Sequence, residues 1–380
     1  MLSDFVYLDN SATTKPCLKA VQNINHALND EWANPSSLYN IGFNAQVLVD
    51  DARKTAAGFL HCREDEIYFT SGGTEGNNTS ILGAAYSRCK RGKRIVTTAI
   101  EHPSVLETLK RLENDGFEVI YIKPQKSGAI AADDLKKYIN RDTILVSIML
   151  VNNETGAIQP VKEAAQIIKS SGAPALLHCD GVQAFGKMPV NLNSLGVDLF
   201  TASGHKIHGP KGVGILYIKK GVTIKPLITG GGQEKNMRSG TESVPLISGF
   251  KGAVDDLGDV NKNLENTSKL WQYTKDILLE TGLVSINSSD DVLPYILNIS
   301  VTGYRSETLL HFLESRGVYV SSGSACAKGA GSYVLGEMGL SKNRTDSALR
   351  ISFSRFNTTA DAEKLKDALV AATQKLRRAN

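Results

Sequence analysis

The sequence has no apolar run that could span a membrane and no basic tract. None of its apolar runs approaches the roughly 18 residues that a transmembrane helix needs. The net charge is only +4, from 43 basic against 39 acidic residues, and the basic residues are dispersed. Nucleic acid is therefore not indicated as a primary ligand. The first residues have neither a basic start nor an apolar core, so we expect no signal peptide and a cytoplasmic location.

Cysteine is also scarce, with five residues at scattered positions. The number is odd and no pair has the spacing of metal ligands, which predicts free thiols in a reducing compartment and no metal site. We expect four of them to be packing residues, whereas the fifth stands in a segment of small residues from 321 to 332. Taken alone, a cysteine in such a segment is more often passive than reactive. The five are Cys17, Cys62, Cys89, Cys179 and Cys326.

The remaining composition is that of an ordinary globular protein. Hydrophobic residues make up 41% and charged residues 22% of the 380 positions, enough chain for two lobes. From residue 66 apolar runs alternate with loops and helical patterns, which predicts an α/β fold with a largely parallel sheet. A long helical stretch is expected at about 246–282, followed by a smaller α/β unit. We predict a large domain over residues 16–257 and a small domain formed by residues 1–15 and 258–380.

Polar residues follow five successive predicted strands, at the point where each strand ends. The carboxyl ends of parallel strands share one edge of the sheet, where α/β proteins bind ligands, so we expect these residues to lie together. Any one of them alone is more often structural, but five at one edge indicate a site. With the strand that precedes each, they are Thr74 (66–70), His102 (94–100), Asn153 (144–151), Asp180 (175–179) and Lys206 (199–202).

The last of these strands runs into Ser203, His205 and Lys206. Taken alone, Lys206 reads as a solvated loop lysine, but lysine amines in such sites form Schiff bases with carbonyl cofactors. Ser203 and His205 can donate hydrogen bonds to an anion. Gly73 and Thr74 open a helix, and the N–H groups of a helix N-terminus suit a phosphate, although most Gly-rich turns are only turns. Together these residues predict a phosphate seat beside an amine.

The same residues meet the needs of an aldehyde cofactor that bears a phosphate and a pyridine nitrogen. Lys206 would form the Schiff base. Thr74, Ser203 and His205 would bind the phosphate. Asp180 would keep the pyridine nitrogen protonated, so that the ring can accept electrons. Gln183, three residues later, could donate to the ring hydroxyl. His102 could stack on the ring and move protons.

Motifs spread over nearly the whole chain carry a resemblance to a known family. The sequence resembles the group I cysteine desulfurases, of the NifS/IscS type, within the class V aminotransferase superfamily of pyridoxal-phosphate enzymes. Its last two motifs distinguish desulfurases from their transaminase relatives. The motifs lie at residues 8–14, 70–75, 101–102, 151–154, 203–206, 238–241, 321–326 and 350–356.

The resemblance implies a fold of type I, a homodimer, and pyridoxal 5'-phosphate held on Lys206. It implies Asn153 beside the cofactor and substrate, Arg350 on the substrate carboxylate, and a threonine of the other subunit, matching Thr241, on the phosphate. Lys206 would move the Cα proton of L-cysteine. The thiolate of Cys326 would take the sulfur as a persulfide and release L-alanine. An acceptor protein, either an iron–sulfur scaffold or a thiolation enzyme, would then receive the sulfur.

Two other readings stay open on the same fold: a selenocysteine lyase and a class V aminotransferase. An aminotransferase does not need Cys326, whereas nothing in the sequence separates the selenium substrate from the sulfur one. A sulfur carrier that has lost catalysis is disfavoured by the intact Lys206, Asp180 and His102. Only residues 327–331 separate Cys326 from the segment 332–335, a shorter loop than in the housekeeping members, which bears on how far the thiol can reach.

Overall fold

The computed structural model describes residues 5–322 and 331–378 of the chain. Its centre is a seven-stranded sheet in the order β2-β8-β7-β6-β5-β3-β4. Every strand runs in the same direction except β8, which is antiparallel to both of its neighbours. The predicted α/β fold with a mostly parallel sheet is therefore confirmed. The strands are β2 (Ile67–Thr70), β3 (Arg94–Thr98), β4 (Glu118–Ile122), β5 (Thr143–Met149), β6 (Leu176–Asp180), β7 (Leu199–Ser203) and β8 (Gly214–Ile218).

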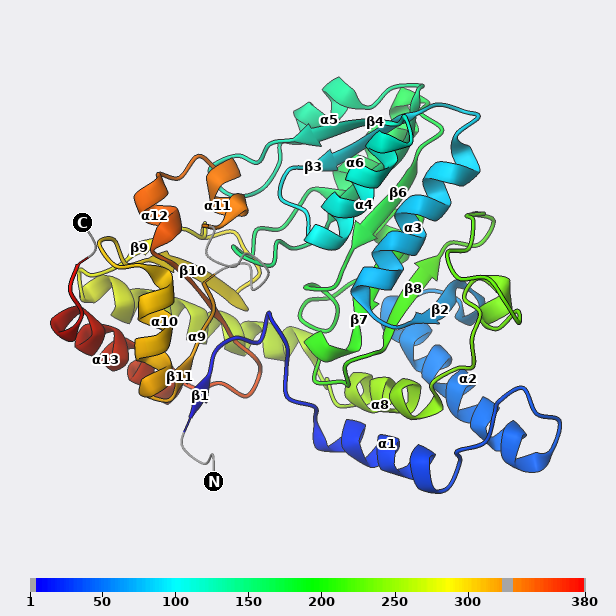
Figure 1. The fold of residues 1–380 in the computed structure, drawn as a ribbon, viewed down its shortest axis with the longest axis horizontal. Coiled ribbons are helices and arrows are strands. Elements are labelled where there is room, and N and C mark those ends of the chain that lie inside the picture. The colour runs from blue at the N-terminus through cyan, green and yellow to red at the C-terminus, as the bar shows by residue number, and fades with distance from the viewer. Residues whose placement is uncertain (1–4, 323–330, 379–380) are drawn as a thin grey trace.

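Helices cover both faces of this sheet, which explains why its central strands read as continuous apolar runs. Neighbouring residues of a strand point to opposite faces. Leu199 packs with α3 and α4 on one face, and Phe200 packs with α2, α6 and α8 on the other. Figure 1 shows α3 and α4 lying across the sheet. These helices are α2 (Asn40–Leu60), α3 (Gly73–Arg88), α4 (Pro103–Asn114), α6 (Val161–Ser171) and α8 (Val244–Asp255).

A second, smaller sheet is antiparallel, in the order β12-β10-β9, and has its own hydrophobic cluster. Strand β1 pairs in parallel with β11, although more than 300 residues separate them in sequence, and Figure 1 shows the two side by side. The N-terminal strand thus joins the later part of the chain. The predicted domain boundaries stay a prediction. The strands are β1 (Val6–Tyr7), β9 (Ser285–Ile286), β10 (Ile296–Ser300), β11 (Val318–Tyr319) and β12 (Ala348–Ser352).

The prediction of one long helical stretch at about 246–282 is wrong, because the stretch is not continuous. The structure has two helices there, α8 and α9, because Gly258 takes a left-handed φ of 63° and Asp259 then caps α9 by accepting hydrogen bonds from Asn261 and Lys262. No helix of the described residues is both long and apolar enough to cross a membrane. The other helices are α1 (Leu18–Asn29), α5 (Ala132–Tyr138), α7 (Leu192–Leu195), α9 (Val260–Glu280), α10 (Ser306–Ser315), α11 (Tyr333–Glu337), α12 (Lys342–Asp346) and α13 (Thr359–Lys375), with short 3-10 turns η1 (Glu64–Glu66), η2 (Gly204–Lys206) and η3 (Glu234–Asn236).

Candidate active site

A pocket of about 290 Å³ lies at the carboxyl ends of β5, β6 and β7. Strand ends of the large sheet supply most of its polar lining, as expected for a parallel sheet. Residues of the N-terminal segment, of β12 and of α11 (Tyr333–Glu337) complete the wall. The structure therefore brings together ten of the twelve residues singled out from the sequence. They are Gly73, Thr74, His102, Asn153, Asp180, Gln183, Ser203, His205, Lys206 and Arg350.

The other two predicted residues do not line this pocket in the described part of the chain. Thr241 is exposed and follows the loop that begins at η3. Its predicted contact is with the pocket of another subunit, so the assignment stays a prediction. Cys326 lies outside the described residues.

Lys206 ends the short turn η2 directly after β7. Its Nζ donates hydrogen bonds to the backbone carbonyl oxygens of Ser11 (2.5 Å) and Ala12 (2.8 Å). The N-terminal segment therefore forms part of the site and holds the amine. Sequence reasoning assigned no role to these two residues, although the motif at residues 8–14 was the signal that could have located them.

Asp180 ends β6 and is 6% exposed. Its Oδ1 accepts a hydrogen bond from the backbone N–H of Val182 (3.0 Å), and its Oδ2 accepts one from the side chain of Asn77 (2.7 Å). These two donors fix the orientation of the carboxylate at the pocket. Asn77 lies on α3, three residues after Thr74, and so on the same face of the helix. That spacing could have indicated it from the sequence.

His102 is the N-cap residue of α4. Its Nδ1 accepts a hydrogen bond from the backbone N–H of Ser104 (3.1 Å), which places the ring proton on Nε2. Burial lowers the pKa of His102, although the Asp180 carboxylate acts in the opposite direction. The imidazole is thus a neutral ring with one N–H, suited to stacking on another ring and to moving a proton.

The N-terminus of α3 and the turn η2 form the predicted phosphate seat. The N-cap Gly72 has a φ of 147° and provides no side-chain cap, so the first N–H groups of α3 remain available to a ligand. A Cβ on Gly73 would meet Val182 Cγ2 at 2.8 Å, and a larger residue would therefore displace its neighbour. Burial, with Lys206 and other nearby lysines, lowers the pKa of His205 to about 4. The lysines, which contribute to this shift after burial, also favour an anion here.

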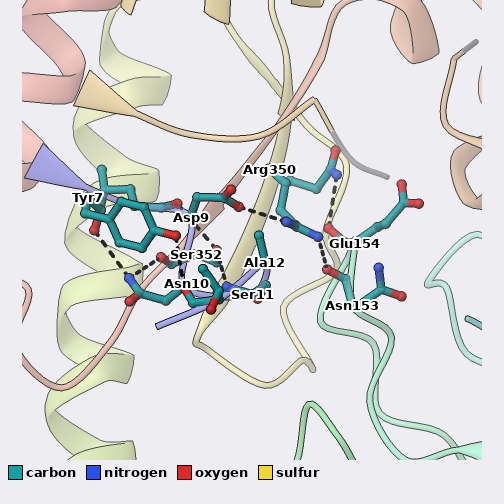
Figure 2. Close-up of polar contacts among 12 residues, drawn as sticks. Tyr7, Asp9, Asn10, Ser11, Ala12, Asn153, Glu154, Arg350 and Ser352 are labelled. Atoms are coloured by element: carbon teal, nitrogen blue, oxygen red, sulfur yellow. Dashed lines mark hydrogen bonds and ion pairs between the residues drawn. The ribbon is translucent and has the colours of Figure 1, made fainter. Parts of the chain in front are cut away.

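Arg350, from β12, connects three segments at the pocket, as Figure 2 shows. Its guanidinium donates hydrogen bonds to Asp9 Oδ1 (2.8 Å) and to the backbone carbonyl of Asn153 (3.0 Å). Only 2% of the residue is exposed. Within the described residues, Arg350 Nε and Asn153 Oδ1 are buried without a hydrogen-bond partner. Buried polar atoms of this kind are ready to bind a ligand.

The pocket fits the cofactor expected from the sequence. It presents an anion seat, a buried carboxylate, a neutral imidazole and a lysine amine, the set that a phosphate-bearing pyridine aldehyde requires. Asn153 Oδ1 also lies in this wall as an unpaired polar atom. Among the described residues, no cluster of three or more His, Cys, Asp or Glu could hold a metal ion.

Comparisons with known proteins identify the family of this chain. A family model described as Aminotransferase class-V matches residues 6–365. The cysteine desulfurase IscS of Methanosarcina thermophila is 40% identical over 380 residues, covering 98% of this chain and 93% of that protein. The cysteine desulfurase IscS of Dictyoglomus turgidum is 38% identical, with coverages of 98% and 95%.

Solved structures give the same result. A NifS-like protein has a TM-score of 0.93 and 36% identity, covering 98% of this chain and all of that one. SspA, solved in complex with cysteine, has a TM-score of 0.83 and 31% identity, with coverages of 93% and 100%. The chain therefore belongs to the class V aminotransferase family of pyridoxal-phosphate enzymes, among the cysteine desulfurases of the NifS/IscS type.

Proposed function

We propose that this chain is a pyridoxal-phosphate-dependent desulfurase that converts L-cysteine to L-alanine and carries the sulfur on Cys326. The observation that supports the proposal most strongly is the convergence of Lys206, Asp180 and His102 on one pocket, in a chain whose relatives are named cysteine desulfurases. Bound pyridoxal phosphate would withdraw electrons from the substrate Cα, which makes the Cα proton easier to remove.

The protein's own residues bind and orient the reacting groups. Asp180 would hold the proton of the pyridine nitrogen, and the N–H groups of Gly73 and Thr74, with Ser203 and His205, would bind the phosphate. The amine of Lys206 would hold the cofactor and, once released, would move the proton at the substrate Cα. Its hydrogen bonds to two backbone carbonyls keep the amine at the pocket.

Arg350 and His102 would act on the substrate and the ring. The guanidinium of Arg350 would bind the substrate carboxylate, beside the unpaired Asn153 Oδ1. Because Asp9 already occupies part of this guanidinium, the carboxylate would share the arginine with it. His102 would stack on the ring, with its Nε2–H available for proton transfer.

The sulfur step would belong to Cys326. Its thiolate would attack the substrate sulfur, so that an S–S bond forms while the substrate C–S bond breaks. The electron pair of the broken bond would remain on carbon and, with a proton, give alanine. The described residues on both sides of the cysteine support this assignment. Ser321 pairs with the backbone of Arg350, a residue of the pocket, and Tyr333 lines the pocket itself.

We further propose a homodimer in which Thr241 of the partner subunit reaches the phosphate. The support is an apolar surface on α1, α2 and the segment between them. Nine of the thirteen exposed large hydrophobic residues in the described chain lie there, and such a concentration of exposed apolar side chains is typical of an interaction surface. They are Leu18, Val21, Leu28, Trp32, Leu38, Tyr39, Ile41, Phe43 and Val47.

The persulfide would pass to an acceptor protein, an iron–sulfur scaffold or a thiolation enzyme. The test of the whole proposal is a turnover assay of the cofactor-loaded protein with L-cysteine, measuring alanine and sulfide under reducing conditions. Cys326→Ala should stop sulfide release, while the matched control Cys89→Ala, an exposed cysteine, should keep it. L-selenocysteine as a parallel substrate separates a selenocysteine lyase, which would accept only the selenium compound. Alanine release without sulfide from the wild type would contradict the proposal.

A further inference from the structure

A second lysine, Lys187, lies buried close to the pocket and has no part in the chemistry above. It follows β6 in the same turn as Gln183, four residues earlier, and only 5% of it is exposed. Its Nζ donates a hydrogen bond to Gln183 Oε1 at 2.8 Å. Burying a lysine is costly and needs a reason beyond packing.

The amide nitrogen of Gln183 also makes a hydrogen bond. Its Nε2 donates to the backbone carbonyl of Ser11 at 3.0 Å, the same carbonyl that accepts from Lys206 Nζ. A lysine amine can donate and a carbonyl can only accept, so the two contacts together define the amide orientation. Oε1 must face Lys187 and Nε2 must face Ser11. The second N–H of the amide then remains for a ligand in the pocket, which Gln183 lines.

We propose that Lys187 is a positioning residue that fixes the Gln183 amide, so that an N–H donor faces the ring hydroxyl of bound pyridoxal phosphate. The inference rests on the proposed function, because it needs that cofactor in the pocket. An N–H donor stabilises the ionised form of the hydroxyl, whereas a carbonyl oxygen in the same place would oppose it. Lys187 would thus tune the cofactor through Gln183 without touching it.

The charges around Lys187 are mostly positive. Burial lowers the pKa of Lys187 well below its ordinary range, and the neighbouring Lys206 and Arg350 act in the same direction. Lys187 in turn lowers the pKa of His205 and His208, while Asp256 acts oppositely on His208. A small cavity is lined by Lys187, Lys206, His208 and Arg355 and by no carboxylate of the described residues. An amine donates to Oε1 in either protonation state, so the hydrogen bond does not depend on the charge.

The test compares two replacements of similar size, Lys187→Met and Lys187→Gln. Methionine removes the donor to Oε1, whereas glutamine keeps an N–H that can replace it. The measurement is a pH titration of the visible absorbance of the cofactor-loaded protein, together with the dissociation constant of pyridoxal phosphate from the apoprotein. Lys187→Met should raise the titration midpoint by about one pH unit and weaken cofactor binding about tenfold. Lys187→Gln should stay closer to the wild type in both.

A double-mutant cycle separates positioning from simple packing. In a Gln183→Leu background the amide is gone, so Lys187→Met should no longer raise the midpoint. The same increase in both backgrounds would overturn the inference, as would an unchanged midpoint in Lys187→Met alone. A wild type without a visible cofactor band would instead contradict the proposed function. If Lys187→Met fails to fold, Lys187→Ala, which also removes the donor to Gln183 Oε1, replaces it in both backgrounds.

Discussion

The two sheets of this chain contribute to the pocket in different ways. The seven-stranded sheet supplies residues from the ends of its parallel strands, such as Asp180 at the end of β6 and Lys206 after β7. The antiparallel sheet supplies Arg350 from the middle of β12, opposite Asn298 in β10. The topology of a parallel sheet places the carboxyl ends of its strands at one edge, so polar residues that follow the strands gather there. An antiparallel sheet contributes a residue to the site only where its packing brings a side chain close.

This comparison suggests that the two sheets have different roles in the reaction. The large sheet would hold the cofactor and the proton-transfer groups, and β12 would hold the substrate carboxylate. Changes in the large sheet should therefore abolish the chemistry, while changes in β12 should mainly weaken substrate binding. The predictions below separate the two, from the largest expected effect to the smallest.

Lys206→Ala should reduce turnover of L-cysteine by about 10⁴-fold or more, because the amine both holds the cofactor and moves the Cα proton. The visible absorbance of the cofactor-loaded protein should change in the same variant. The matched control is Lys169→Ala, which removes an exposed lysine of α6 and should leave both unchanged. A Lys206→Ala protein that keeps substantial turnover would contradict the assignment of the amine.

Arg350→Met should raise KM for L-cysteine by about 10- to 100-fold and lower kcat much less, since the guanidinium would bind the carboxylate in ground and transition states alike. The variant should also melt at a lower temperature, because Asp9 loses its ion pair. Arg63→Gln, which breaks an exposed ion pair with Asp65, is the control and should change neither. A large loss of kcat with KM unchanged would contradict the assignment of substrate binding to Arg350 of β12.

The smallest predicted effect concerns acid stability, which should depend on the large sheet. Burial lowers the pKa of His178, in β6, to about 3. The unfolded chain, with the ordinary histidine pKa near 6.5, takes up a proton first as the pH falls. The free energy of unfolding should therefore decrease below about pH 6.5, by roughly 1 kcal/mol per pH unit for this histidine.

Urea unfolding of the wild type and of His178→Asn at several pH values between 7 and 5 measures this slope. The asparagine variant should show a flatter dependence, although it is less stable at pH 7. His311→Asn, an exposed histidine of α10, should leave the slope unchanged. Equal slopes for wild type and His178→Asn would show that the buried ring is not the source.

The sequence predicted the large-sheet part of the site well, because strand ends can be read from apolar runs and their breaks. His102, Asp180 and Lys206 were located in this way. Contacts that depend on tertiary packing could not be predicted from local pattern. Ser11 reaches Lys206 across 195 positions of sequence, and Tyr333 reaches the pocket from the start of α11.

Other features show the limit of the resemblance. It supplied the role of Arg350, but it could not indicate that Asp9 would share the guanidinium. The break between α8 and α9 was missed because a single glycine, Gly258, interrupts an otherwise continuous helical pattern. The contact of Thr241 with a second subunit and the position of Cys326 stay predictions.

The most direct test of the central claim is a single turnover without reductant. Cofactor-loaded protein is mixed with one equivalent of L-cysteine per subunit, and alanine is measured together with the intact mass of the peptide that contains Cys326. The account predicts one alanine per subunit and the addition of one sulfur atom to Cys326, with Cys17, Cys62, Cys89 and Cys179 unmodified. Alanine formed without a sulfur adduct on Cys326, or an adduct on another cysteine, would contradict it.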